Sequence, residues 1–263
     1  MVNREWKSSG CLSRSCPALF GVNGLVLLGT VHCDPKGLSR TRSFLELHKP
    51  DLVLVEISDF ALKFRIERSA GLRKIFLHRL RIVADRMQID FDTALKHVEI
   101  ASIFRQIGFP YEYRASAAYA RRAGMDLVAV DKSGFSREWI GTWPEMISAE
   151  NIERLLELES PRPSVSSLYA HAARRIAARP LPNEAPPADA ERWREREKQM
   201  ARRIRSALKR HSPERAVYIG GWWHLSWGGS IKTIRELLGV GPDSCMLLDR
   251  GAAVSRQGDA QGR

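Results

Sequence analysis

Two histidines in this chain each stand three residues after a glycine, at the end of an apolar segment. They are His32, in the motif GTVH that starts at Gly29, and His224, in the motif GWWH that starts at Gly221. A glycine at that place lets the backbone turn sharply and leaves room for a ligand. Imidazole nitrogens bind zinc, manganese, cobalt or iron, so the pair of motifs predicts a site for a divalent metal ion.

Acidic side chains follow other apolar segments at comparable places. Glu56, Asp131 and Asp249 each come directly after a run of four apolar residues. Carboxylates combine with imidazole in metal sites, so these acids are candidates for the same site. Each residue by itself also has a structural interpretation: a hydrogen-bonded histidine, an acid at a helix N-terminus, or a turn residue.

The segments that must position these side chains have the pattern of a mostly parallel α/β sheet flanked by helices. Short apolar runs predict strands buried on both faces, at 25–28, 52–55, 127–130, 216–219 and 245–248. Helical periodicity lies between them, at about 38–48, 60–106, 112–123, 188–209 and 230–238. Ligands of open α/β sheets bind beyond the carboxyl ends of the strands, where the candidate side chains would converge.

Two parts of the chain repeat one order of features: strand, Gly-x-x-His, loop, helix, strand and acid. His32 and Glu56 are 24 positions apart, and His224 and Asp249 are 25 positions apart. Repeated strand–helix–strand units favour parallel pairing in an α/β sheet, and we expect a single domain at 21–251. Loosely ordered tails are expected at 1–20 and 252–263.

Composition sets limits on the class of protein. Of 263 residues, 44% are hydrophobic and 27% are charged, which is ordinary for a globular domain. The net charge of +12 favours acidic partners, and ten Lys and Arg residues fall between Arg192 and Arg215. Glu191, Glu195 and Glu197 are interleaved with them, which is typical of a solvated helix with i,i+4 pairs. Only Trp193 is available there for base stacking, so nucleic-acid binding is not expected.

Cysteine usage and hydropathy predict the cellular setting. The four cysteines form no C-x-x-C pair and no disulfide framework: Cys11, Cys16, Cys33 and Cys245. They indicate a reducing compartment. The amino terminus has no secretory apolar region, and no segment has the length to cross a bilayer. We therefore expect a soluble cytoplasmic protein, with its oligomeric state open.

Taken in order, these motifs resemble the TraB/PrgY/GumN–Tiki family. GTVH and GGWWHL match its two Gly-x-x-His motifs, and LVLVE and LVAVD match its strands that end in Glu56 and Asp131. EYRASAAYA matches the helix start at Glu112. REREKQMA matches the family's Arg at Arg196, whereas Glu197 stands where the family has Asn. The resemblance spans about residues 25–249.

The resemblance implies an α/β fold with two related halves, similar to that of erythromycin esterases, and a metal-dependent hydrolase site. On that basis His32, Glu56 and His224 are the expected ligands of a divalent metal that activates water and polarises a carbonyl. Glu112 would act as general base or complete the metal shell. Arg196 would bind a carboxylate or stabilise an oxyanion. A peptide or ester bond is the expected target.

The predicted pocket has further residues at its wall and at its entrance. Those expected at the wall are Gly29, Asp131, Gly221 and Asp249. Those expected to narrow the entrance with apolar surface, for a small or extended substrate, are Trp222, Trp223 and Trp227.

Two other classes of function stay open. A non-catalytic protein would bind a metal, haem or another small ligand in the same pocket. An interaction or signalling module would instead use the basic helices.

Overall fold

The computed structural model describes residues 24–32, 34–158, 163–177, 189–227 and 229–251. The tails predicted at 1–20 and 252–263 lie outside these residues, as do Cys11, Cys16 and Cys33. Cys245, within them, carries a free thiol. No described helix has both the length and the hydropathy needed to span a membrane.

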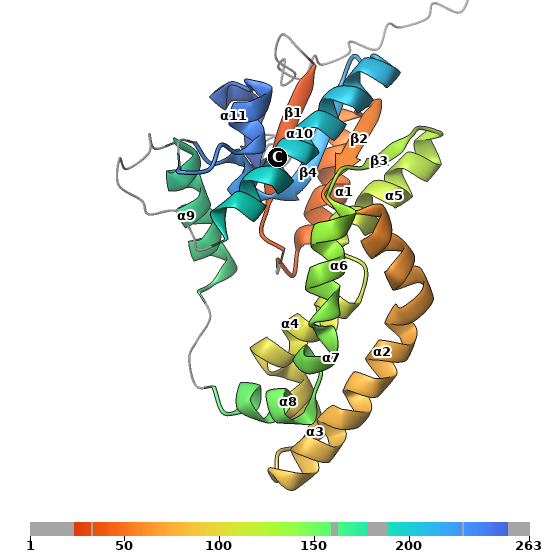
Figure 1. Cartoon of the computed structure of the whole chain (residues 1–263), viewed down its shortest axis with the longest axis vertical. Helices are drawn as coiled ribbons and strands as arrows, with labels where there is room; N and C mark the ends of the chain where they lie inside the picture. The colour runs from red at the N-terminus through yellow and green to blue at the C-terminus, as the bar shows by residue number, and fades with distance from the viewer. Residues whose placement is uncertain (1–23, 33, 159–162, 178–188, 228, 252–263) are drawn as a thin grey trace, which may run out of the picture.

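One parallel sheet of five strands lies in the upper half of the molecule as drawn in Figure 1. The strands run in the order β3-β2-β4-β1-β5, and all adjacent pairs are parallel. Their bounds are β1 Leu25–Thr30, β2 Leu52–Val55, β3 Leu127–Ala129, β4 Ala216–Gly221 and β5 Cys245–Leu247. The predicted α/β class and the predicted parallel sheet are confirmed.

The chain leaves the two central strands toward opposite edges of the sheet. From β1 it passes through α1 (Gly37–His48) to β2, which lies beyond β4. From β4 it passes through α11 (Ile234–Leu238) to β5, which lies beyond β1. The strand order therefore reverses between β1 and β4, and such a switch point is where open α/β sheets bind ligands. The two histidine motifs follow the two strands that flank it.

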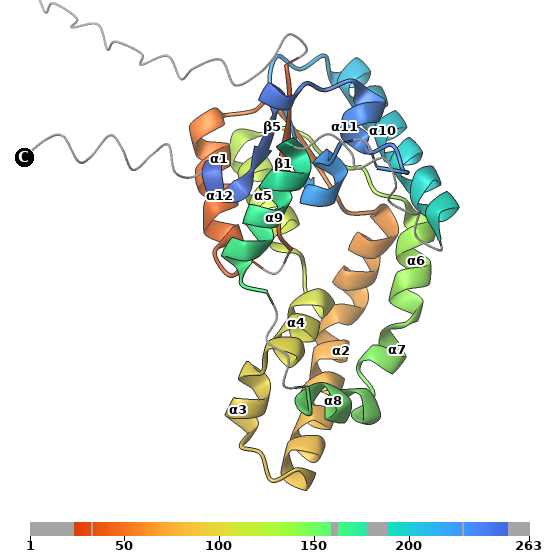
Figure 2. The ribbon, with the colours of Figure 1, turned by 90° about the vertical axis from the view of Figure 1, so that its left-hand side faces the viewer.

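Helices cover both faces of the sheet, which explains why the strands are continuous apolar runs. Phe44 of α1, Tyr119 of α5 (Tyr111–Ala123) and Tyr169 of α9 (Val165–Ala177) pack on one face. On the other face lie α10 (Ala190–His211) and α11, whose buried side chains include Met200, Ile204 and Ile234. Figure 2 shows these two layers on either side of β1 and β5.

A group of helices extends from the carboxyl ends of β2 and β3, and we call it the helical lobe (59–107 and 133–156). Its helices are α2 Asp59–Arg86, α3 Phe91–Lys96, α4 Val98–Ile107, α6 Ser133–Gly141, α7 Trp143–Met146 and α8 Ala149–Leu156. Figure 1 shows the lobe projecting away from the sheet. It has its own core, which includes Phe76, Leu80 and Trp143.

Some element boundaries differ from the predicted ones. The long helical segment at 60–106 is broken after Arg86, and Asp90 caps α3 by accepting a hydrogen bond from the Thr93 backbone. Near the carboxyl terminus, α11 begins only at Ile234, because Thr233 forms a capping box with Glu236. The last strand ends one residue early, where α12 (Leu248–Gly251) begins.

Candidate functional site

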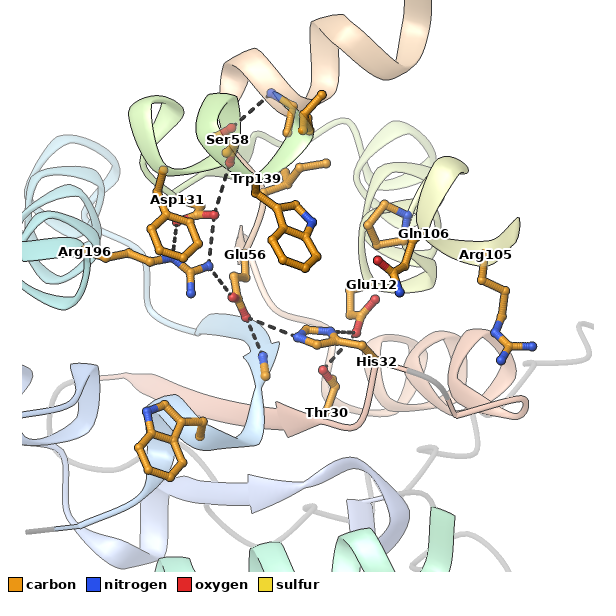
Figure 3. A pocket seen from close by; sticks show the side chains of 18 of the residues that line it. Thr30, His32, Glu56, Ser58, Arg105, Gln106, Glu112, Asp131, Trp139 and Arg196 are labelled. Carbon is orange, nitrogen blue, oxygen red and sulfur yellow. Dashed lines mark hydrogen bonds and ion pairs between the residues drawn. The ribbon is translucent and has the colours of Figure 1, made fainter. Parts of the chain in front are cut away.

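A cavity of about 730 Å³ lies between the carboxyl ends of the strands and the helical lobe. His32, Glu56 and Gly221 reach it from the sheet, and Trp139 of α6 and Arg65 of α2 reach it from the lobe. Figure 3 shows Glu56, His32 and Trp139 directed toward one another in the middle of this space. The cavity occupies the switch point of the sheet, where the predicted site residues were expected to converge.

His32 is held at the cavity wall by a carboxylate from α5. Its Nδ1 atom lies 2.8 Å from Oε1 of Glu112, and the Thr30 hydroxyl donates to the same oxygen at 2.9 Å. Glu112 is buried, whereas the side chain of His32 is 62% exposed. The contact therefore orients the imidazole from inside the protein while the ring itself borders the cavity.

His224 is oriented in the same way from the opposite side of the site, but inside the core. It lies in the short 3-10 helix η1 (Trp222–Leu225) and is buried. Its Nδ1 atom donates to Oε1 of Glu197 at 2.5 Å. The second oxygen of Glu197 accepts from the backbone nitrogen of Ile234 at 2.6 Å. Glu197, noted in the sequence only as a departure from the family's Asn, is thus the partner of a site histidine.

Glu56 is the point at which the two histidines meet. Its Oε1 atom lies 3.0 Å from Nε2 of His224, and its Oε2 atom lies 4.0 Å from Nε2 of His32. The backbone nitrogen of Gly221 donates to Oε2 at 2.5 Å. Each histidine therefore approaches one shared carboxylate with Nε2, while its Nδ1 contacts a glutamate of its own.

The two glycines at the end of β4 make this close approach possible. A Cβ atom at Gly221 would lie 2.9 Å from Nε2 of His32, and one at Gly220 would lie 2.7 Å from Oε2 of Glu56. Side chains at these positions would occupy the space that the imidazole and the carboxylate share. Gly221 therefore leaves room for the imidazole of His32.

Arg196 joins Glu56 to Asp131. Its Nη2 atom donates to Oε1 of Glu56 at 2.7 Å, and its Nε atom donates to Oδ1 of Asp131 at 2.8 Å. All three side chains are buried or nearly so, and the guanidinium also packs on the rings of Phe135 and Trp193. Two nitrogens of Arg196 are thus engaged by the protein's own carboxylates.

The charges of this network shift the pKa values of its members. Burial disfavours ionisation of Glu56, but the adjacent His224 and Arg196 outweigh burial and hold its pKa well below the usual value. Burial likewise opposes the protonated histidines. Glu197 and Glu56 nevertheless raise the pKa of His224 to about 10, and Glu112 and Glu56 raise that of His32 to about 9. Both shifts favour the protonated form of the imidazole in the metal-free protein.

Two predicted pocket residues lie away from the cavity. Asp249 belongs to α12, which packs against α1, because the short strand β5 runs directly into that helix. Gly29 lies beneath the site, where a Cβ atom would meet side chains of Leu225 and Leu247. The pocket assignment is therefore wrong for Asp249, and Gly29 contributes packing space beneath the site rather than cavity wall.

The aromatic entrance is only partly as predicted. Trp222 and Trp223 line the cavity, whereas Trp227 packs on the guanidinium of Arg235, 4.9 Å from its ring centre. Trp139 and Trp193 were not predicted at the site, and both line it. They reach the cavity through tertiary packing, which no local motif signals.

The basic helix α10 is solvated on its outer face only. Its inner face buries Met200, Ala201 and Ile204, together with the site residues Arg196 and Glu197. Helix α10 is therefore a wall of the site, where Arg196 was expected, and its charges are solvated on the other face. The apolar spacing of Met200, Ile204 and Ala207 among the charges is the sequence signal for this buried face.

Comparisons of the chain with protein-family models, with characterised proteins and with solved structures found no significant match. The geometry of the cavity and the motifs of the sequence therefore carry the functional interpretation.

Proposed function

We propose that this chain is a metal-dependent hydrolase of the TraB/GumN–Tiki type, which cleaves a peptide or ester bond. The observation that carries the proposal is the convergence of His32 and His224 on Glu56 through their Nε2 atoms. Each Nδ1 atom is held by a separate glutamate. Histidines that bind metals in proteins place their second nitrogen against a carboxylate or carbonyl in this way.

His32, Glu56 and His224 are the residues that would hold the ion. Within the described residues, no group of three His, Cys, Asp or Glu side chains has the mutual spacing of a formed metal site. Ligand atoms on one tetrahedral zinc lie roughly 3.3 Å apart. The 3.0 Å between His224 and Glu56 agrees with that separation, and a small movement of the exposed His32 ring would shorten its 4.0 Å contact. The types of donor suit a divalent metal, and we propose that the His32 ring moves toward Glu56 when the ion binds.

A divalent metal in this set would polarise the scissile carbonyl and lower the pKa of water. Because metal ligands must be deprotonated, binding of the ion would release protons from the two histidines. The Nδ1 protons would stay hydrogen-bonded to Glu112 and Glu197, and the lone pair of each Nε2 atom would be free to bind the ion. This assigns Glu112 an orienting role in addition to the two roles expected from the resemblance.

Arg196 would act by holding Glu56 in place. Its Nη2 atom bonds both Glu56 and Asp131, so the carboxylate of Glu56 is restrained from two sides by Arg196 and the Gly221 backbone. A restrained ligand loses less conformational freedom when the metal and substrate bind. In this role Arg196 is a positioning residue.

The proposal includes the relation between two halves of the chain. The units β1–α1–β2 and β4–α11–β5 interlock, so that the second strand of each unit pairs with the first strand of the other. Gly29 pairs with Gly220 rather than with Gly221, so the two histidines are offset by one residue. The two imidazoles also differ in burial, with His32 exposed and His224 buried in η1.

A second candidate is a non-catalytic protein that binds haem or another small ligand in this cavity. The observation that favours it is the 62% exposed ring of His32 beside a wall that contains Trp139 and Trp223. An exposed imidazole next to an apolar slot is the arrangement that an axial haem ligand needs.

The experiment that tests both candidates starts from protein stripped with chelator and reloaded separately with zinc, manganese, cobalt or iron. Each form is screened against peptide and ester libraries, with His32→Ala and His224→Ala as variants. His78→Ala, at an exposed position of α2, is the matched control. Cleavage that needs one metal and is lost only in the two site variants supports the hydrolase. If no form cleaves and the protein retains haem, the binding candidate replaces it.

A further inference from the structure

Two arginines of the helical lobe bring positive charge to the cavity. They are Arg65 of α2 and Arg105 of α4, and both line it. The three acids that line the cavity are already engaged. Glu56 and Asp131 pair with Arg196, and Glu112 contacts His32. The balance of charge on the lobe side of the cavity is therefore positive.

Arg65 is a buried cation whose hydrogen bonds go to neutral groups. Nε donates to the Gly108 carbonyl at 2.9 Å, Nη1 to the Ala61 carbonyl at 3.2 Å and Nη2 to the Gln106 carbonyl at 3.3 Å. A guanidinium has five N–H donors, so these bonds leave two. In the described part of the chain it forms no ion pair, and burial lowers its pKa to about 10. An anion in the cavity would relieve the cost of this buried charge.

Arg105 is exposed and places a second guanidinium at the same cavity. Figure 3 shows it on the side of Glu112 and Gln106, opposite Arg196. Its side chain forms no hydrogen bond or ion pair with another described residue. No contact of this kind among the described residues would therefore have to break before Arg105 binds a ligand.

The same cavity presents aromatic surface to solvent. Trp139 is 52% exposed and Trp223 is 38% exposed, and both line the cavity. Exposed indole rings of this size favour a ligand with an apolar or aromatic group.

We propose that the cavity selects a ligand with a free carboxylate, bound by Arg65 and Arg105, and an apolar or aromatic group packed against Trp139 and Trp223. An N-acylated dipeptide with a free carboxyl terminus is the simplest member of this class. The inference deepens the proposed hydrolase, because the bond to be cleaved would lie between these two groups, beside His32 and Glu56. Recognition of the carboxylate itself requires neither a metal nor catalysis.

The test measures binding to metal-free protein by calorimetry. The probes are N-(2-naphthoyl)-Gly-Gly and its neutral carboxyl-terminal amide. We expect the carboxylate to bind at least tenfold more tightly than the amide, because charge-assisted pairs with arginine are the stronger hydrogen bonds. Arg105→Met should remove most of this ratio. Arg68→Met, at an exposed position of α2 away from the cavity, should leave it unchanged.

Equal affinity for the two probes would overturn the inference, as would a ratio that is the same in wild type, Arg105→Met and Arg105→Glu. Arg65→Met is measured together with its thermal unfolding, because Arg65 also ties α2 to the end of α4. The binding preference and the cleavage assay together test carboxylate recognition and the proposed hydrolase separately. A tenfold preference without cleavage under any metal rejects only the hydrolase, and cleavage without the preference rejects only carboxylate recognition.

Discussion

The side chain of His224 donates from Nδ1 to Oε1 of Glu197 across 2.5 Å, and both residues are buried. The same carboxylate accepts from the backbone of Ile234, at the start of α11. One buried acid therefore connects the histidine turn after β4 to the helix that follows it. Because a buried carboxylate is stable only when its oxygens are bonded, these two contacts depend on each other.

Replacement of Glu197 tests this connection. We expect Glu197→Ala to lower the free energy of unfolding by about 3 kcal/mol, because it leaves a protonated imidazole and a helix N–H without their partner. Chemical denaturation followed by circular dichroism measures the change. Glu191→Gln, on the exposed face of the same helix, is the control and should change stability by less than about 0.5 kcal/mol. Equal stability of the two variants would show that the contact contributes nothing.

The pKa values of the site predict how the stability of the metal-free protein depends on pH. The pKa of His224 is raised from 6.5 to about 10 in the folded state. The contribution of His224 to the free energy of unfolding is therefore full below pH 6.5 and is lost as the pH rises to about 10. The pKa of Glu56 is lowered in the folded state. The contribution of Glu56 to the free energy of unfolding is therefore present above pH 4.5 and is lost as the pH falls below that value. Denaturation midpoints measured across pH should therefore fall at both ends. In His224→Gln the alkaline decline should be smaller, and an unchanged alkaline slope would contradict the assignment.

The sequence was sufficient for the sheet and for the site residues at its strand ends. Strands such as β1 and β4 are buried on both faces, so each is a continuous apolar run with an unambiguous pattern. The parallel arrangement then brings the residues after those strands to one edge. This is why His32, Glu56 and His224 could be placed at one edge without coordinates, together with Asp131 and Asp249.

The lobe side of the cavity could not be predicted. Arg65 and Trp139 reach it from α2 and α6, whose positions depend on packing between segments far apart in the chain. The same limit explains Asp249, which follows a strand as Asp131 does but is carried away by α12. A position after a strand indicates only that a residue is near the edge, and the next element decides where its side chain lies.

Gly221 should be required for the metal site but not for the fold. In Gly221→Ala the new Cβ would lie 2.9 Å from Nε2 of His32, and the exposed imidazole can move away without disturbing the core. We expect zinc affinity, measured by competition with a chromogenic chelator, to fall at least tenfold (a loss of about 1.4 kcal/mol). Gly71→Ala is the control, because a Cβ there meets nothing within 4 Å. It should bind zinc normally and be slightly more stable, as alanine favours a helix. Equal zinc affinity of the two variants would argue against His32 as a ligand.

Arg196 should be required for the stability of the site because it is the cation that Glu56 and Asp131 share. We expect Arg196→Met to lower the free energy of unfolding by about 3–5 kcal/mol, since two buried carboxylates lose the arginine that they share. Arg202→Met, at an exposed position of the same helix, should have little effect. Adding Asp131→Leu to Arg196→Met should recover part of the loss, because one unpaired charge is then removed. If Arg196→Met is as stable as Arg202→Met, Arg196 is not the partner on which the two carboxylates depend. If the double variant is less stable than the sum of the single changes, the coupling has the opposite sign to the one that the geometry predicts.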